Sequence, residues 1–245
     1  MSRLRPLSLP AILLLAASLL GCQDGGPSSE PSAPAASARY VKAADPGAVA
    51  ACLREGDTVL ELADSPLPTQ ALAFGDGESA VILAHQAGQK PCAWADHGRT
   101  LAAQGHRVFI PTLVTPESTM GAAVAWLREQ GADRYALVGA SMGGTFSLVA
   151  TPGLDPAPRL VVALSSPAVY GSWDATAVIG ELEVPVLLLV GERDGSFAAD
   201  ARELAEAQPE AELLVVDASA HGIALIAADA DVASRLDAAL ADALR

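Results

Sequence analysis

One serine lies in a sequence pattern that suits nucleophilic chemistry. Ser141 is flanked by Gly139 and Gly143, with an apolar run at residues 135–138 before them and a run of helical character that begins at Met142. The pattern predicts a strand, a sharp turn and a helix. A turn that lifts a serine hydroxyl clear of the backbone leaves no room for side chains two residues before and two residues after it, which explains both glycines. The hydroxyl attacks a carbonyl carbon only when a base accepts its proton, so the interpretation depends on whether an acid and then a histidine follow, each after its own strand.

The Gly-Ala-Ser-Met-Gly pattern in this context resembles the nucleophile elbow of the α/β-hydrolase superfamily. Members of that family carry the acid after a late strand in a Gly-x-x-Asp arrangement, and the apolar run at residues 185–190 leads into such an arrangement that ends at Asp194. They carry the histidine after the last strand, where His221 follows the run at residues 213–216. The resemblance therefore implies that Ser141, Asp194 and His221 form a catalytic triad, in the chain order of this family.

Other acidic residues and histidines fit these roles less well. Glu192 and Asp200 are the rival acids, but both suit solvated positions, the latter at the start of an expected helix. His97 and His106 have neither the chain order nor the place in the topology that the family requires of its base.

A second loop resembles the part of the family that stabilises negative charge on the reacting oxygen. Residues 80–84 form a continuous apolar run, typical of a central parallel strand, which ends at His85. The His-Gln-Ala-Gly sequence that starts there falls where the family has His-Gly-x-Gly, the loop whose backbone N–H helps to form the oxyanion hole. We expect the donors to be the N–H of Ala87, or of Gln86 if the loop is shifted by one residue, and the N–H of Met142. Gln86 replaces the usual glycine, and His85 is expected to brace the loop through hydrogen bonds.

Apolar runs alternate with amphipathic stretches along the rest of the chain. This alternation predicts an α/β architecture, and with the resemblance an α/β-hydrolase fold, in which helices flank a mostly parallel, doubly wound sheet. Few residues separate the strand at 160–164 from the one at 185–190, so no large cap domain is expected, and Tyr170 and Trp173 in this connection either line a pocket or pack in the core. The opening antiparallel strands are expected at residues 58–62 and 70–74, a further strand at 108–110, and helices at 44–55, 92–104, 116–130, 201–208 and 231–244.

The amino-terminal segment is typical of an exported protein. Arg3 and Arg5 precede an apolar run at residues 7–20 that is short for a bilayer span, as in a secretory signal. The Leu-Leu-Gly-Cys sequence that ends at Cys22 resembles the lipobox of bacterial lipoproteins, whose cysteine is lipidated; an ordinary signal peptide or an uncleaved anchor is the alternative. We therefore expect a lipid-anchored protein of the bacterial cell envelope, periplasm-facing or surface-exposed. The predicted parts are a signal peptide at 1–21, the lipidated cysteine and a flexible tether at 22–39, and an α/β-hydrolase domain at 40–245.

Charge and cysteine content exclude some classes of function. The chain has a net charge of −14, and removal of residues 1–21 takes away two arginines and no acids. An acidic surface without a basic cluster repels phosphate backbones, so nucleic-acid binding is not expected. If Cys22 is lipidated, Cys52 and Cys92 either pair in a disulfide or remain two buried thiols. No Cys or His pair has metal-ligand spacing, so no metal is expected.

Together with the resemblance, these features predict a serine hydrolase that forms an acyl-enzyme with a small-molecule ester and needs no cofactor. The small size, the His-Gln-Ala-Gly loop and the expected lack of a cap are similar to the small carboxylesterase and dienelactone-hydrolase-like branches of the family. The nucleophile of dienelactone hydrolases proper is cysteine, whereas position 141 is a serine, which favours a carboxylic ester, a thioester or a related acyl group. The alternatives are a membrane-tethered binding protein with this fold and no turnover, and a peptidase or lipid deacylase.

Overall fold

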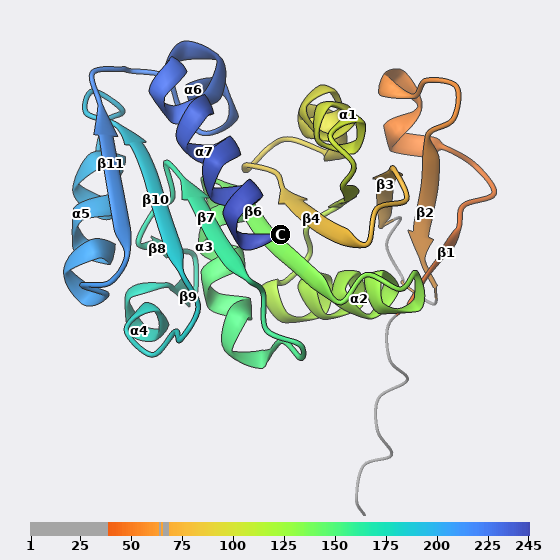
Figure 1. Ribbon diagram of the computed structural model, residues 1–245, viewed down its shortest axis with the longest axis horizontal. Coiled ribbons are helices and arrows are strands. Elements are labelled where there is room, and N and C mark those ends of the chain that lie inside the picture. Colours follow the sequence, from red (N-terminus) through yellow and green to blue (C-terminus); the bar gives the residue numbers. More distant parts are fainter. Residues whose placement is uncertain (1–38, 64, 66–68) are drawn as a thin grey trace, which may run out of the picture. The chain divides into compact units, whose positions relative to one another are not determined.

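A nine-stranded sheet forms the centre of the computed structural model of this protein (Figure 1). The structure describes residues 39–63, 65 and 69–245, so the predicted signal peptide, the predicted lipidation site Cys22 and nearly all of the predicted tether lie outside the described residues. The strand order across the sheet is β1-β2-β3-β5-β4-β6-β7-β10-β11. The strands of the sheet are β1 (Tyr40–Lys42), β2 (Thr58–Leu62), β3 (Gln70–Phe74), β4 (Ser79–Ala84), β5 (Arg107–Pro111), β6 (Arg134–Ala140), β7 (Leu160–Leu164), β10 (Val186–Gly191) and β11 (Glu212–Val216).

The sheet is parallel over most of its width and antiparallel at one edge. β4 pairs in parallel with β5 and with β6, and the parallel pairing continues through β7 and β10 to β11. β3 runs antiparallel to β5 and to β2, and β2 runs antiparallel to β1. The predicted fold class, a mostly parallel, doubly wound sheet with antiparallel opening strands, is therefore confirmed.

The path of the chain reverses direction in the middle of the sheet. From β4 the chain moves to β5 on one side, then crosses to β6 on the other side of β4, and from there β7, β10 and β11 follow outward. At such a reversal, the loops that follow the two adjacent strands, here β4 and β6, lead away in opposite directions. Open parallel sheets bind their ligands between these loops. In this protein that position belongs to the loops after β4 and β6.

Helices cover both faces of the sheet because its central strands are apolar on both. The helices α2, α3, α4 and α5 cover one face of the sheet, and α1, α6 and α7 cover the other (Figure 1). Ile82 of β4 packs into the core on the first face, whereas its neighbours Val81 and Leu83 pack into the core on the second. Within the described ranges, no helix has both the length and the apolar character needed to cross a bilayer. The helices are α1 (Ala95–Ala103), α2 (Pro116–Glu129), α3 (Met142–Ala150), α4 (Thr176–Ile179), α5 (Phe197–Ala207), α6 (Ile223–Ala228) and α7 (Ala230–Ala243).

The first predicted helix is shorter and tighter than the sequence suggests. Within the predicted span 44–55, the structure has the 3-10 helix η1 (Gly47–Cys52). Asp45 Oδ1 accepts a hydrogen bond from Gly47 N–H at 2.8 Å, and Gln70 Oε1 accepts one from Ala48 N–H at 2.8 Å. A side chain of β3 thus supports the first turn of η1, which no local pattern reveals.

The structure also contains elements that the sequence did not predict: β1, α6 and a small hairpin of β8 (Val169–Tyr170) and β9 (Trp173–Asp174). In addition, α5 begins at Phe197 rather than at residue 201.

A disulfide joins the two cysteines that the sequence leaves either paired or free. Cys52 at the end of η1 and Cys92 in the 3-10 helix η2 (Pro91–Trp94) have their sulfur atoms 2.07 Å apart and their Cα atoms 5.6 Å apart. Pairing is thus the alternative that the structure shows. The bond fastens the segment directly after the His-Gln-Ala-Gly loop to the segment before β2.

Candidate active site

Ser141 lies between β6 and α3 in a strained backbone conformation. Its φ is 50° and its ψ is −122°, and a non-glycine residue in such a sparsely populated region costs on the order of 1–3 kcal/mol. Hydrogen bonds on both sides maintain this geometry: Ser141 N–H donates to Leu164 O of β7 at 2.8 Å, and Gly144 N–H donates to Ser141 O at 2.8 Å. Ser141 is 7% exposed and stands at the carboxyl edge of the sheet, directly after the central strand β6.

Three glycines make this turn sterically possible. A Cβ on Gly139 would overlap Gly143 O, and a Cβ on Gly143 would overlap the main chain at the end of β4. The two glycines that flank Ser141 therefore have the steric role that the sequence pattern predicts. Gly144 is a further requirement that sequence analysis missed, because a Cβ there would overlap Ser166 Oγ. The signal for it was the second glycine directly after the pattern.

His221 and Asp194 are in direct contact on neighbouring loops. The imidazole Nδ1 lies 3.1 Å from Asp194 Oδ1 and 3.0 Å from Oδ2. An ionised carboxylate only accepts hydrogen bonds, so Nδ1 carries the hydrogen and Nε2 is left as an acceptor, the form that a general base needs. The ring also packs against Phe197, with centroids 4.3 Å apart. The rival acids lie elsewhere: Glu192 is exposed and pairs with an arginine of α5, and Asp200 lies in the first turn of α5.

The loops that carry the serine and the histidine meet beside these two residues. A Cβ on Gly222, which follows His221, would lie 3.4 Å from the Cβ of Ala140, which precedes Ser141. Among the described residues, no hydrogen bond joins the Ser141 hydroxyl to the His221 ring. The side chain of His221 is 29% exposed, so its outer nitrogen can be reached from solvent. The structure therefore pairs the predicted base with the predicted acid and brings their loops to the predicted nucleophile.

The loop after β4 offers backbone donors that nothing else uses. Gln89 N–H donates to Gln86 O at 3.2 Å, and Gly88 takes a positive φ of 73°, so the four residues form a tight turn. In the described part of the chain, the backbone N–H groups of Gln86, Ala87 and Met142 donate no hydrogen bond. The N–H of Met142 is free because it begins α3, where a helix has no internal acceptor for it. Both alternatives for the donor on this loop, Ala87 and Gln86, therefore stand.

His85 braces this loop, as its position in the sequence predicts. Leu113 N–H donates to His85 Nε2 at 3.3 Å, so the ring donates from Nδ1 to Gln86 O at 3.0 Å. One nitrogen accepts and the other donates, which requires the neutral ring. Burial lowers the pKa of His85, and the hydrogen bond to Gln86 O only partly opposes this effect. Trp94 adds a second brace, since its indole N–H donates to Ala84 O at 3.0 Å.

The architecture is similar to that of solved structures whose sequences differ widely from this one. No family model matches the chain, and no curated protein matches its sequence. An enol-lactonase from Burkholderia xenovorans LB400 is 17% identical and has a TM-score of 0.58, and the match covers 69% of this chain and 96% of that one. A dienelactone hydrolase from Anabaena variabilis ATCC 29413 is 18% identical with a TM-score of 0.57, over 82% of this chain and 97% of that one. A carboxylesterase, CesB from Bacillus subtilis, is 14% identical with a TM-score of 0.56, over 71% and 87%.

The chain has the α/β-hydrolase fold. Within this fold, the connection from β7 to β10 is short and forms no large cap; it contains the β8–β9 hairpin and α4. Tyr170 and Trp173 of the hairpin have nearly parallel rings, and both meet Phe146 of α3 edge-on, at 6.3 Å and 4.6 Å between centroids. Of the two roles predicted for these aromatics, the contacts favour packing.

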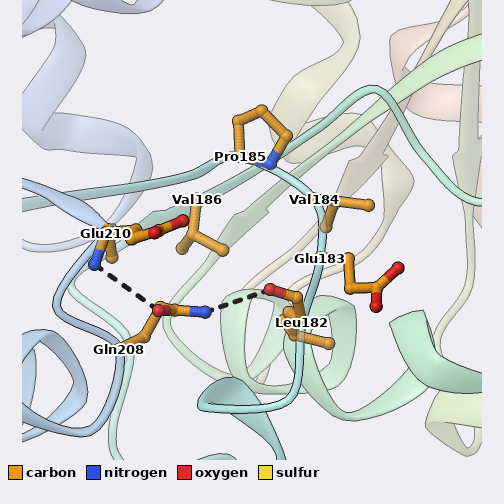
Figure 2. A pocket seen from close by; sticks show the side chains of 8 residues that line it. Leu182, Glu183, Val184, Pro185, Val186, Gln208 and Glu210 are labelled. Atoms are coloured by element: carbon orange, nitrogen blue, oxygen red, sulfur yellow. Dashed lines mark hydrogen bonds between the residues drawn. The ribbon is translucent and has the colours of Figure 1, made fainter.

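Figure 2 shows a hollow in this α/β-hydrolase domain. It lies at the opposite end of the strands from the loops that carry Ser141, Asp194 and His221. It has a volume of about 200 Å³ and borders the start of β10 and the loop before β11. The amide of Gln208 is already satisfied, since Nε2 donates to Leu182 O at 3.0 Å (Figure 2). It also donates to Ile179 O at 3.1 Å. Glu210 N–H donates to Gln208 Oε1 at 3.4 Å. None of Ser141, Asp194 and His221 lines this hollow.

Proposed function

We propose that this protein is a serine hydrolase that cleaves a small carboxylic ester, or a related acyl substrate, through an acyl-enzyme. One observation supports this above the others: a strained serine, a histidine paired with a carboxylate and unused backbone donors lie on loops at one edge of the sheet. Ser141 is the nucleophile, His221 the base and Asp194 the group that orients the base. The same edge holds the reversal of strand order, where sheets of this kind bind ligands.

The proposed reaction has two halves that use the same groups. As Ser141 Oγ attacks the ester carbonyl carbon, His221 Nε2 accepts its proton, and Asp194 stabilises the resulting imidazolium. The N–H of Met142 and that of Ala87, or alternatively Gln86, donate to the oxyanion of the tetrahedral intermediate. The intermediate collapses, the C–O bond to the alcohol breaks, and His221 returns the proton to the leaving oxygen. Water then attacks the acyl-enzyme by the same route, which releases the acid and restores Ser141. No metal or organic cofactor takes part.

Support for the substrate class comes from the similar structures. The similar structures named above are a lactonase, a dienelactone hydrolase and a carboxylesterase, and a lactone is a cyclic ester. These similarities favour an ester as the substrate.

Labelling with a fluorophosphonate probe tests the nucleophile directly. The domain at residues 40–245 should be labelled, and the label should be lost in Ser141→Ala and in His221→Ala. Ser172→Ala is the matched control, because Ser172 is an exposed serine that should not react. Turnover of p-nitrophenyl acetate and butyrate should follow the same pattern. Absent labelling of the wild type, or labelling that survives in Ser141→Ala, would contradict the proposal and leave a binding protein with this fold.

The bond that is cleaved is tested with a matched set of substrates. Esters, a thioester, an anilide, a short peptide and a phospholipid are offered to the same preparation, and the products are analysed. We expect turnover of the esters and the thioester above the others. Faster cleavage of the peptide or the phospholipid would instead support the peptidase or the lipid deacylase.

We also propose that the protein is a lipoprotein of the bacterial cell envelope, attached through Cys22. The support is the lipobox-like sequence and the preceding apolar run. Metabolic labelling with a clickable palmitate should mark the full chain and not Cys22→Ser. Equal labelling of both would contradict the attachment site, and so would a wild-type protein that carries no lipid.

A further inference from the structure

Gln86 connects two loops that are far apart in the sequence. Its side-chain oxygen Oε1 accepts a hydrogen bond from Ile223 N–H at 3.3 Å. Gln86 belongs to the loop after β4 that carries the candidate oxyanion donors, and Ile223 lies two residues after His221. The contact therefore joins the loop of the oxyanion donors to the loop of the base.

The hydrogen bond satisfies a helix end that has no cap of its own. Ile223 is the first residue of α6, and Gly222 before it has no side chain with which to cap the helix. The first N–H groups of a helix lack internal acceptors, so a partner must come from elsewhere. Gln86 provides that partner from the other side of the site. Because Ile223 N–H needs an acceptor, the amide is oriented with Oε1 toward it and Nε2 away.

The glycine after the base is shaped around this amide. Gly222 has a positive φ of 58°, and a Cβ there would overlap Gln86 Oε1 and lie 3.4 Å from the Cβ of Ala140. The chain thus passes between the Gln86 amide and the residue before the nucleophile with no space for a side chain. The main chain of Gln86 is held as well, since its carbonyl accepts from His85 Nδ1 at 3.0 Å. A glycine at position 86 would leave this space empty and the amide contact unmade.

We propose that Gln86 is a positioning residue, which fixes the base loop against the oxyanion loop through the hydrogen bond to Ile223; this inference rests on the proposed function. The ring of His221 contacts Asp194 and Phe197, and the carbonyl of His221 accepts a hydrogen bond from Ala224 N–H at 3.2 Å, so these contacts come from the loop after β10, from α5 and from the base loop's own helix. The Gln86 amide adds a contact from the loop after β4. Two loops from β4 and β11, at different places in the sheet, are thereby kept in one geometry, as acyl transfer requires.

Two substitutions separate the acceptor oxygen from the rest of the amide. Gln86→Met keeps the length of the side chain and removes the acceptor, whereas Gln86→Glu keeps an acceptor for Ile223 N–H and removes the NH₂ group. Because a misplacement near 1 Å lowers rates by up to about 10²-fold, Gln86→Met should lower kcat by about 10-fold to 100-fold with little change in KM. Gln86→Glu should stay within about threefold of the wild-type kcat on its high-pH plateau, with the acid limb of its pH profile moved upward by the added negative charge near His221. Equal losses in both variants would overturn the positioning role and assign the effect to the NH₂ group.

Hydrogen exchange measures the same contact without any turnover. In Gln86→Met, the peptides that span residues 217–228 should take up deuterium faster than in the wild type, while Gln86→Glu should resemble the wild type. Gln104→Met is the matched control, because that glutamine is exposed and its side chain makes no hydrogen bond in the described structure. Unchanged exchange in Gln86→Met would overturn the inference. An inactive wild type with the expected exchange pattern would instead count against the proposed function alone.

A double substitution supplies an independent check. In Gly222→Ala the new Cβ displaces the Gln86 amide, so this variant and Gln86→Met both break the same contact. Their effects on kcat should therefore be strongly non-additive, with the double variant close to the worse single one. Losses that multiply would show that the two residues act separately and would overturn the coupling.

Discussion

Gly143→Ala is the substitution whose effect on the site is most directly set by the structure. A Cβ on Gly143 would lie 2.6 Å from the carbonyl carbon of Ala84 and 2.8 Å from His85 O. An unstrained contact of this kind needs about 3.4 Å or more. Ala84 O lies closer still to this Cβ, so the main chain at the end of β4, or the first turn of α3, must move by about 0.8 Å or more. No side-chain rotation can absorb the movement, because both neighbours are backbone atoms.

The displacement affects stability and catalysis by different amounts. Overpacking of this kind costs about 1–3 kcal/mol, which for a domain of this size lowers the melting temperature by about 2–12 °C. The moved segment leads directly into the candidate oxyanion donors, and a misplacement near 1 Å lowers kcat by up to about 10²-fold. We therefore expect Gly143→Ala to remain folded at 25 °C and to lose most of the proposed esterase activity. Circular-dichroism melting, ester turnover and the rate of fluorophosphonate labelling measure the three effects.

Gly121→Ala is the matched control for this experiment. Gly121 lies on the exposed side of α2, and a Cβ there would meet nothing within 4 Å. This variant should gain about 0.5–1 kcal/mol of stability, as alanine does over glycine in a helix, and should keep full activity. A Gly143→Ala protein with wild-type melting temperature and turnover would refute the steric reasoning about the elbow.

Three further changes follow from other parts of the structure. Asp194→Asn should lower kcat by about 10⁴-fold with little change in melting temperature, because the amide no longer holds His221 in the form with Nε2 free; a loss of less than tenfold would point to another acid. Replacing both Cys52 and Cys92 by serine should lower the free energy of unfolding by about 2–4 kcal/mol in urea titrations, and a reductant should destabilise the wild type but not this variant. Burial lowers the pKa of His85 in the folded protein. The unfolded chain, with the ordinary histidine pKa of about 6.5, therefore binds the proton more readily, and the folded state loses stability as the pH falls below that value. Between pH 7.5 and 5.5 the melting temperature of His85→Gln should fall less than that of the wild type, and equal decreases in the two proteins would contradict this account.

The sequence contains enough information to place the elements that carry the candidate site. Residues 80–84 and 135–138 are apolar without interruption because helices cover both faces of the sheet, and such runs are readable without any alignment. The elbow is readable for a different reason. The turn at Ser141 has no space for side chains at positions 139 and 143, so both positions are glycine, and this pattern is visible in the sequence. The order of the acid and the histidine then follows from the order of the strands.

The features that escaped prediction depend on contacts between distant segments. η1 replaces a regular helix because Gln70, from β3, supports its first turn. The Gln86–Ile223 contact spans 137 residues, and nothing within either loop indicates its partner. β1 is an edge strand of three residues, too short to show a period. Whether Cys52 and Cys92 pair depends on how η1 and η2 meet, which again only the folded chain determines.

The β8–β9 hairpin offers a place to add new structure to this protein by engineering. Its tip, Gly171 and Ser172, is exposed, and the strands on either side of the whole connection, β7 and β10, are paired neighbours in the sheet. An inserted helical segment at the tip can therefore begin and end at nearly the same point without disturbing the register of any strand. Libraries of such insertions would add segments of different size to this connection and leave the loops that carry Ser141, Asp194 and His221 unchanged, and selection among them would show which insertions alter the proposed esterase activity.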